Sequence, residues 1–401
     1  MEENNQASGT RSTSMIQEDH EASSVEDILK EAIKNRHQIL YLNYKCLPEF
    51  PMVLCSVKED GQSLYDHVER LYMKRNLLET LPSGISRLCG LKELYLHSNN
   101  LSSLPDELSA VPHLESLDVS ENCLQNLPSS IGRCPCLQKL ILSNNQLNQL
   151  PPEIGNIKTL ETLIVNDNHL SLLPTEIGNC VKLKSLNVDR NRLRRLPRQL
   201  TRLVYLEELS AQGNKLLYIP MDLGCCTDAL RSVYVDNNPH LEAVPFNLWK
   251  KDVGARRCGT LPILESEYSA SLRVNVDGMS ALLPPEIKVA MTTVDSKVYQ
   301  VPSLLEITLK YVNSVLGCNR YTSQENLDTL PKDLAERVRF PISNCSAPNG
   351  CDNKIFTIAW VHLLKIKWAQ PWQEDANSIG LVAFLCSETC YKIFKRIPIP
   401  I

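Results

Sequence analysis

Four cysteines near the C-terminus form two close pairs, Cys345 with Cys351 and Cys386 with Cys390. Cysteine thiolates are the usual ligands of structural zinc sites, in which four protein atoms surround the metal as a tetrahedron. The two pairs therefore predict one structural zinc ion with no open coordination position. The alternative is that the four cysteines are free thiols in a small core.

The second pair lies in Phe384-Leu385-Cys386-Ser387-Glu388-Thr389-Cys390, which resembles the Phe-Cys-Ser-x-x-Cys signature of treble-clef zinc fingers. The resemblance implies that Cys386 opens a helix, that Cys390 lies one turn further, and that a distant cysteine knuckle completes the site. Two features depart from the signature. Five residues separate Cys345 from Cys351 where two are usual, and Leu385 is an extra residue before Cys386.

Leu304, Thr308 and Val312 recur every four positions, which predicts one apolar helix face. With the later segment Leu330-Pro331-Lys332-Asp333-Leu334, this order resembles a SOCS box, in which the first helix docks Elongin C and the Leu-Pro element helps to select a cullin. The resemblance implies a substrate receptor that binds Elongin B/C. Thr308 and Asp333 depart from the cysteine and proline usual there, and packing of the helix against the last repeat is the alternative.

Motifs of catalysis are missing from the sequence. It has no Gly-x-Gly-x-x-Gly, phosphate loop, His-Glu-x-x-His or Gly-x-Ser-x-Gly. None of its eight histidines is placed to activate a cysteine or serine. We therefore expect a protein that is not an enzyme.

Upstream of these segments, seven stretches share one pattern of leucines, with an asparagine at its centre and a Leu-Pro at its end. The asparagines follow one another at a step of 23 residues: Asn76, Asn99, Asn122, Asn145, Asn168, Asn191 and Asn214. This step lies within the period of leucine-rich repeats. The sequence thus predicts an α/β fold, a horseshoe-shaped solenoid with a parallel β-sheet on its concave face, followed by a small α+β C-terminal domain.

Within one repeat, Leu94 and Leu96 alternate with polar neighbours, as in a strand with one buried face. Asn99 ends the strand and is expected to join an internal ladder that satisfies backbone groups, so we assign the asparagines no ligand role. A short helix is expected over 106–111. Several repeats continue as Leu-Pro-x-x-Ile-Gly, which resembles the repeats of Ras-pathway scaffold proteins and makes a signalling scaffold the alternative function.

Five regions are predicted: a disordered acidic and serine-rich tail (1–24), the repeats with their caps (25–250), a connecting segment (251–300), the SOCS-box-like segment (301–340) and the zinc-binding segment (341–401). The net charge of −4 and the absence of long apolar runs indicate neither nucleic-acid nor membrane binding. Without a signal sequence, we expect reduced cysteines and a cytoplasmic protein, with the nucleus not excluded.

Strand residues that alternate with the core leucines are predicted to point to the concave side and to bind a protein partner. They are Tyr41, Tyr72, Lys74, Tyr95, His97, Asp118, Ile141, Ile164, Asn187, Asp189 and Tyr234. Tyrosines gather at the N-terminal end beside Lys74 and Arg75, a mixture that favours binding hot spots. The arginines of 190–202 could meet an acidic partner or phosphates, but they are expected to spread around one repeat.

The segments Glu69–Asn76, Leu94–Asn100, Val188–Leu193 and Tyr234–Asn238, together with the C-terminal tail, are similar to the leucine-rich repeat-containing protein 28 family of animals. The resemblance covers about residues 37–394. It implies an intracellular protein and supplies no biochemical role.

Overall fold

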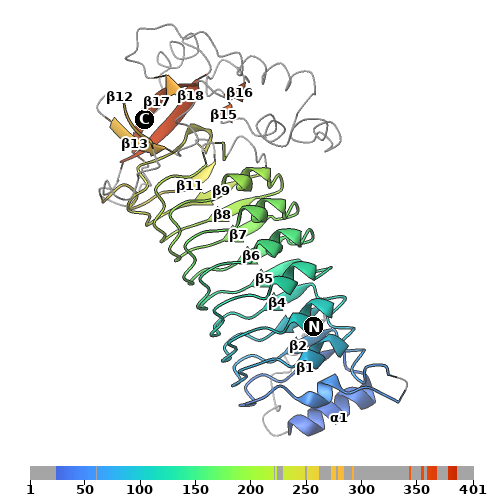
Figure 1. Cartoon of the computed structure of the whole chain (residues 1–401). Helices are drawn as coiled ribbons and strands as arrows, with labels where there is room; N and C mark the ends of the chain where they lie inside the picture. The colour runs from blue at the N-terminus through green and yellow to red at the C-terminus, as the bar shows by residue number, and fades with distance from the viewer. Residues whose placement is uncertain are drawn as a thin grey trace, which may run out of the picture.

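The computed structural model describes residues 24–59, 61–220, 222–223, 229–248, 251–261, 272–276, 279–283, 291–292, 343–344, 354–355, 359–367 and 378–385. Most of this part of the chain is one elongated solenoid, with helix α1 at one end and the C-terminal strands at the other (Figure 1).

Helix α1 (Val25–Asn35) closes the N-terminal end of the solenoid. Ser24 caps it, since its Oγ accepts a hydrogen bond of 3.2 Å from the Asp27 amide. The apolar face of the helix buries Leu29 against the first repeat, where the Tyr65 hydroxyl donates to the Leu29 carbonyl oxygen at 3.4 Å. The helix covers apolar side chains that would otherwise face water.

Ten three-residue strands form one parallel sheet in the order β1-β2-β3-β4-β5-β6-β7-β8-β9-β11. Their bounds are β1 (Ile39–Tyr41), β2 (Arg70–Tyr72), β3 (Glu93–Tyr95), β4 (Ser116–Asp118), β5 (Lys139–Ile141), β6 (Thr162–Ile164), β7 (Ser185–Asn187), β8 (Glu208–Ser210), β9 (Ser232–Tyr234) and β11 (Asp252–Gly254). The central residue of each strand is a buried leucine or valine. This confirms the predicted fold class of a leucine-rich solenoid.

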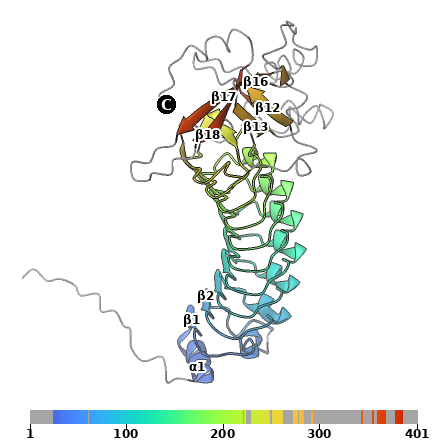
Figure 2. The same ribbon diagram turned by 90° about the vertical axis from the view of Figure 1, so that its left-hand side faces the viewer.

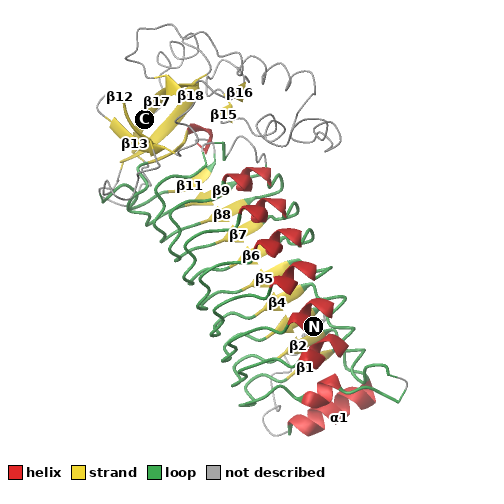
Figure 3. Cartoon of the chain, in the orientation of Figure 1, coloured by secondary structure: helices red, strands yellow, loops and turns green. Residues whose placement is uncertain are grey.

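The second column of the solenoid is a stack of short 3-10 helices on the outer side of its curve, opposite the sheet (Figures 2 and 3). They are η1 (Met52–Cys55), η2 (Ser83–Arg87), η3 (Asp106–Ala110), η4 (Ser129–Arg133), η5 (Pro152–Asn156), η6 (Thr175–Asn179) and η7 (Arg198–Arg202). Each follows a proline that stands at its N-cap. Four or five residues make only one to two tight turns, so the short helix expected over 106–111 has 3-10 geometry, as η3.

Glycine in the Leu-Pro-x-x-Ile-Gly segments has a packing reason. A Cβ at Gly155 would overlap the carbonyl oxygen of Glu176 in the next 3-10 helix, and Gly132 and Gly178 meet the following helix in the same way. Close approach of two backbones requires a residue without a side chain. The motif therefore follows from how the repeats stack.

The asparagine ladder connects each repeat to the one before it. Asn145 Nδ2 donates to the Val119 carbonyl at 3.0 Å and to the Leu142 carbonyl at 3.1 Å, while its Oδ1 accepts from the Leu124 amide at 3.0 Å. Asn76 through Asn238 repeat this arrangement. Buried backbone groups at every turn are thereby satisfied, which agrees with the predicted structural role of these asparagines.

Strand β11 extends the sheet beyond residue 250, where the repeats were expected to end. Cys258 takes the place of the ladder asparagine in this last copy, and its Sγ donates to the Val235 carbonyl oxygen at 3.2 Å. In this copy Leu261-Pro262 begins three residues after Cys258, whereas Leu81-Pro82 begins five residues after Asn76, so its sequence lacks the spacing that marks the other repeats.

The described C-terminal strands join the solenoid through β10 (Ala243–Pro245). It pairs in parallel with β18 (Ser378–Leu385), in the sheet order β10-β18-β17-β14 that also holds β17 (Ala359–Lys367) and β14 (Met291–Thr292). The other described elements are the hairpin of β12 (Leu272–Val276) and β13 (Met279–Leu283), the pair β15 (Ser343–Asn344) and β16 (Lys354–Ile355), and η8 (Phe246–Leu248). Leu282 is buried in one cluster with Leu217 and Tyr218 of the repeats.

Candidate functional site

The concave face is formed by side chains that flank the buried central residue of each strand. Sheet register places Tyr41 opposite Tyr72, Tyr72 opposite Tyr95, and Tyr95 opposite Asp118. The predicted residues Ile141, Ile164, Asn187 and Tyr234 continue the same row. Lys74, His97 and Asp189 belong to a second row two positions further along. All these predicted side chains except the buried Asp118 are partly or fully exposed.

Three tyrosines form a continuous stack at the N-terminal end of this face. The ring centroids of Tyr41 and Tyr72 are 5.0 Å apart with an interplanar angle of 24°, and those of Tyr72 and Tyr95 are 4.6 Å apart at 12°. Tyr41 at the outer end is 53% exposed. Since strands of one sheet are about 4.8 Å apart, tyrosines at the same register must stack if their rings face along the sheet. We call Tyr41, Tyr72 and Tyr95 the tyrosine stack.

One cation borders the tyrosine stack, and the next residue in the chain contacts Tyr44, which lies outside the stack. Lys74 Nζ lies 5.5 Å from the Tyr72 centroid and 5.4 Å from the Tyr95 centroid. Because these two rings face each other, an ammonium nearly equidistant from both lies beside the stack rather than above a free ring face. Arg75 Cζ lies 5.6 Å from the ring centroid of Tyr44. Neither cation belongs to an ion pair among the described residues.

The carboxylate nearest to the stack is already occupied. Glu93 accepts a hydrogen bond of 2.9 Å from the Tyr95 hydroxyl, and its other oxygen lies 3.4 Å from Arg70 Nε. Burial, together with the hydrogen bond to Glu93, raises the pKa of Tyr95 to about 12. Tyr95 therefore stays a neutral hydrogen-bond donor at physiological pH.

Asp118 is the next residue in the row after Tyr95, and it is a buried carboxylate rather than an aromatic side chain. It is 8% exposed, and its Oδ1 accepts from the Ser120 amide at 3.0 Å and the Ser120 hydroxyl at 2.6 Å. His97 Nδ1 lies 3.5 Å from its Oδ2. Asp118 thus holds its own neighbours in position. The half-buried Ile141 and Ile164 come next and form an apolar centre between two polar ends.

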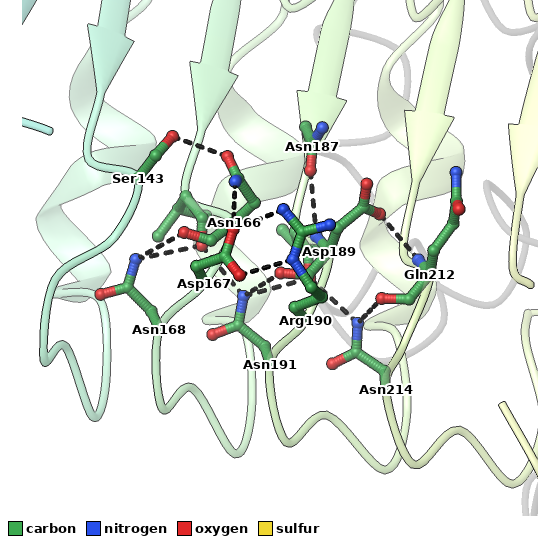
Figure 4. A network of polar contacts seen from close by, with 12 residues as sticks. Ser143, Asn166, Asp167, Asn168, Asn187, Asp189, Arg190, Asn191, Gln212 and Asn214 are labelled. Carbon is green, nitrogen blue, oxygen red and sulfur yellow. Dashed lines mark hydrogen bonds and ion pairs between the residues drawn. The ribbon is translucent and has the colours of Figure 1, made fainter. Parts of the chain in front are cut away.

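A polar network covers the C-terminal half of the face (Figure 4). Ser143 donates to the Asn166 amide oxygen at 2.6 Å, and Asn166 donates to Asp167 at 2.6 Å. Arg190 Nη2 donates to Asp167 at 2.6 Å. This hydrogen bond holds the pKa of the Asp167 carboxyl below its usual value.

Asp189 is held in the same network. Its amide donates to Asn187 Oδ1 at 3.0 Å, and its carboxylate accepts from the Ser210 hydroxyl at 2.6 Å and the Gln212 amide at 2.7 Å. At the last strands, the Tyr234 hydroxyl donates to Asp252 at 3.0 Å. Asp167, Asp189 and Asp252 therefore have donors within the protein.

The arginines of 190–202 do not act as one free basic patch. Arg190 pairs with Asp167, and Arg198 Nη2 lies 3.0 Å from the buried carboxylate of Asp222. The first lies at the end of a strand and the second on η7. Much of the positive charge is thus used within the fold.

Several predicted site residues lie outside the described part of the chain: Leu304, Thr308 and Val312 of the Elongin-docking hypothesis, and Cys345, Cys351, Cys386 and Cys390 of the zinc hypothesis. The described residues contain no group of three or more histidines, cysteines or acidic residues that could hold a metal ion. No helix in the described ranges has the length and apolarity needed to cross a membrane.

Sequence analysis missed Tyr44 and the bridge from Arg70 to Glu93 and Tyr95. A signal for Tyr44 existed, because it precedes Arg75 by 31 positions, the same offset that pairs Tyr41 with Tyr72. The bridge could not have been found, because it depends on which side-chain conformations the stack allows.

Comparisons with known proteins agree with this architecture. Residues 89–147 match the family model described as leucine rich repeat. Solved structures similar to this chain include a leucine-rich repeat protein of Leptospira interrogans (22% identity over 57% of this chain and 87% of that one, TM-score 0.36). YopM, a leucine-rich effector protein from Yersinia pestis, is 28% identical over 59% of this chain and 60% of that one (TM-score 0.47). The family match, the 23-residue step and the asparagine ladder together show that this chain carries a leucine-rich repeat solenoid.

Proposed function

We propose that this protein is a non-enzymatic interaction protein that binds a protein partner on the concave face of its solenoid. Leucine-rich repeat domains in general mediate protein–protein interaction and carry no built-in chemistry. The observation that carries the proposal is that most positions of each repeat have a structural role, whereas the exposed strand positions do not. Inward residues fill the core, asparagines and glycines join the repeats, and the rows beside the central strand residues keep exposed side chains without such a task.

The face also has the composition of a binding surface. It combines the tyrosine stack at one end, Ile141 and Ile164 at the centre and a pre-ordered polar network at the other end. Rigid aromatic side chains contribute contact area at a low entropic cost, and ordered polar groups fix the orientation of a partner. Repeats along one sheet therefore offer a partner three chemically different zones.

The test is a quantitative pull-down with the full chain and two variants. Ile164→Glu places a charge at the apolar centre of the concave face, and Asn156→Glu places the same charge on the exposed outer helix η5. We expect partners that are retained by the wild type and by Asn156→Glu and are lost with Ile164→Glu, with both variants folded by circular dichroism. Partners that respond equally to both substitutions would contradict binding on the concave face.

We further propose that the C-terminal part links the captured partner to a cullin-RING ubiquitin ligase, as its SOCS-box-like segment implies. Supporting this division, β10 and β18 pair in parallel, so the C-terminal strands continue from the end of the solenoid rather than from its concave face. The proposal includes structural zinc held by Cys345, Cys351, Cys386 and Cys390. The resemblance to the leucine-rich repeat-containing protein 28 family is consistent with an interaction protein.

Purified Elongin B/C tests the ligase proposal directly. Binding by the wild type and its loss in Leu304→Ala/Val312→Ala, with the fold retained, would support a substrate receptor. Without Elongin binding, the alternative of a signalling scaffold remains for the same concave face. The Leu-Pro-x-x-Ile-Gly motif adds little to that alternative, because stacking of the 3-10 helices already accounts for its glycine.

A further inference from the structure

Two positive charges at the N-terminal end of the concave face, Lys74 and Arg75, have no ion pair among the described residues. Glu93 is already engaged by Arg70 and Tyr95, which leaves Lys74 and Arg75 without a carboxylate partner among the described residues. Their contacts with rings do not replace one, because the Lys74 ammonium lies beside the stack. An ammonium that is not paired within the fold can bind an anion without first breaking an ion pair.

In the C-terminal half, the two aspartates of the polar network are already bound within the protein. Asp167 is bound by Arg190, and Asp189 by Ser210 and Gln212. Hydrogen bonds from the protein thus already satisfy part of the accepting capacity of these carboxylates. The N-terminal and C-terminal halves of the concave face thus differ in whether their charged side chains are already paired. The end with the tyrosine stack therefore offers Lys74 to a negative charge of the partner, whereas Asp167 and Asp189 already have donors within the protein.

The tyrosine stack favours the same sign. Each face of Tyr72 is covered by a neighbouring ring, so the stack presents ring edges and hydroxyls to solvent. Ring edges carry partial positive charge, and neutral phenols are hydrogen-bond donors. A nucleobase would need a free ring face to stack upon, and the central ring, Tyr72, offers none. An anionic side chain meets positive ring edges, the Tyr41 hydroxyl and an ammonium together, while the Tyr95 hydroxyl stays bound to Glu93.

We propose that the tyrosine stack with Lys74 and Arg75 is a docking site for an extended acidic segment of the partner, with Lys74 receiving a carboxylate. The three rings span two centroid steps, 5.0 and 4.6 Å, which is about the length of three residues of extended chain. Apolar or aromatic side chains of the segment cover the rings, and an aspartate or glutamate beside them reaches Lys74. This inference rests on the proposed function and specifies the partner's chemistry.

Selection of peptides tests it. Phage-displayed random peptides of about 12 residues are selected on the full chain and, separately, on the Lys74→Glu variant. Wild-type protein is expected to enrich peptides with aspartate or glutamate next to apolar residues, and the variant to enrich lysine or arginine at the same place. Equal enrichment by both proteins, or enrichment without acidic residues, would overturn the inference.

Synthetic forms of one enriched peptide then provide the quantitative measurement, by fluorescence anisotropy. Replacing its glutamate by glutamine should weaken binding to wild type about tenfold and leave binding to Lys74→Gln unchanged, as a coupled pair requires. Lys139→Gln is the matched control, because Lys139 is an exposed lysine of the same sheet face on β5. An equal loss in both lysine variants would reduce the effect to general electrostatics and contradict a specific contact.

The same peptides separate this inference from the proposed function. Binding that is abolished by Ile164→Glu but unaffected by Lys74→Gln would overturn the acidic docking site and leave concave binding intact. If no enriched peptide responds to any substitution on the face, both fail. If a single-stranded RNA oligonucleotide binds the wild type and competes with the peptides, and Lys74→Gln weakens its binding, the ligand of this site is a nucleic acid and the inference of an acidic segment is overturned.

Discussion

Tyr72 and Tyr95 face each other across adjacent strands, with ring centroids 4.6 Å apart, and Lys74 Nζ lies 5.5 and 5.4 Å from the two centroids. The rings are fixed by the sheet register, while the lysine borders them without a carboxylate partner among the described residues. Tyr72 and Tyr95 thus form part of the surface itself, whereas Lys74 is available to a partner.

Substitution of the lysine should therefore affect the stability of the protein less than substitution of a stacked tyrosine. Lys74→Gln is expected to change the free energy of unfolding by less than about 0.5 kcal/mol, because a half-buried cation without an ion pair contributes little beside the rings. Tyr72→Ala removes a ring packed on both faces and should cost about 1–2 kcal/mol. Urea unfolding of both variants measures this. A large loss in Lys74→Gln would show that the lysine is structural.

The asparagine ladder is expected to stabilise the solenoid strongly. Asn145→Ala leaves the Val119 and Leu142 carbonyls and the Leu124 amide without their partner, at about 1–3 kcal/mol for each buried group that water cannot reach. Its urea midpoint should fall well below that of Gln146→Ala, the exposed neighbour. Equal midpoints would contradict the assigned role of the ladder.

The glycines of the outer 3-10 helices should tolerate substitution as poorly as the ladder asparagines. Gly155→Ala introduces a methyl group that overlaps the Glu176 carbonyl, and we expect a loss of about 1–3 kcal/mol. Ser109 holds the equivalent position in η3, where a side chain is accommodated. Ser109→Ala is therefore the matched control and should have a melting temperature close to that of wild type. A wild-type melting temperature for Gly155→Ala would show that the outer helices separate easily.

Buried thiols predict a loss of stability at alkaline pH. Burial raises the pKa of Cys180 to about 11 and that of Cys258 to about 12, above the ~8.5 of an exposed thiol. Between these values the folded state keeps protons that the unfolded chain has released. The contribution of the thiols is therefore complete below about pH 8.5 and declines as pH rises towards 11–12.

Urea midpoints between pH 7 and 10.5 check this dependence. The wild type should be level to about pH 8.5 and fall above it, and Cys180→Ala should fall less steeply. Other groups also titrate in this range, so the comparison between the two proteins isolates the thiol. Parallel curves would contradict the effect of burial.

The regular part of the fold could be predicted from the sequence because the 23-residue step ties each strand to the next. Asn76 to Asn214 located the ladder, and alternation around leucines such as Leu94 located the exposed rows. Strand β11 was missed because Cys258 replaces asparagine and the following Leu261-Pro262 comes two residues earlier than the Leu-Pro of the other repeats. A thiol can donate the same hydrogen bond to a carbonyl, so the ladder continues although the sequence pattern stops.

The sequence could predict which candidate site residues share one face of the sheet, but not how their side chains contact one another. The sequence placed Tyr41, Tyr72 and Tyr95 on one face, yet the stacking angles and the position of Lys74 depend on side-chain packing. Burial of Asp118 beside Ser120 likewise removes a predicted contact residue from the surface. These outcomes depend on local competition for hydrogen bonds, which periodicity does not contain.

Site-specific photo-crosslinking tests the central claim most directly. A photoreactive phenylalanine analogue is placed at Tyr95 and at Ile164 on the concave face, and at Asn156 on the outer helix, in the full chain expressed in cells. Binding on the concave face predicts that Tyr95 and Ile164 crosslink to one common protein and that Asn156 does not. Crosslinks to that protein from Asn156, with none from the two concave positions, would contradict the claim.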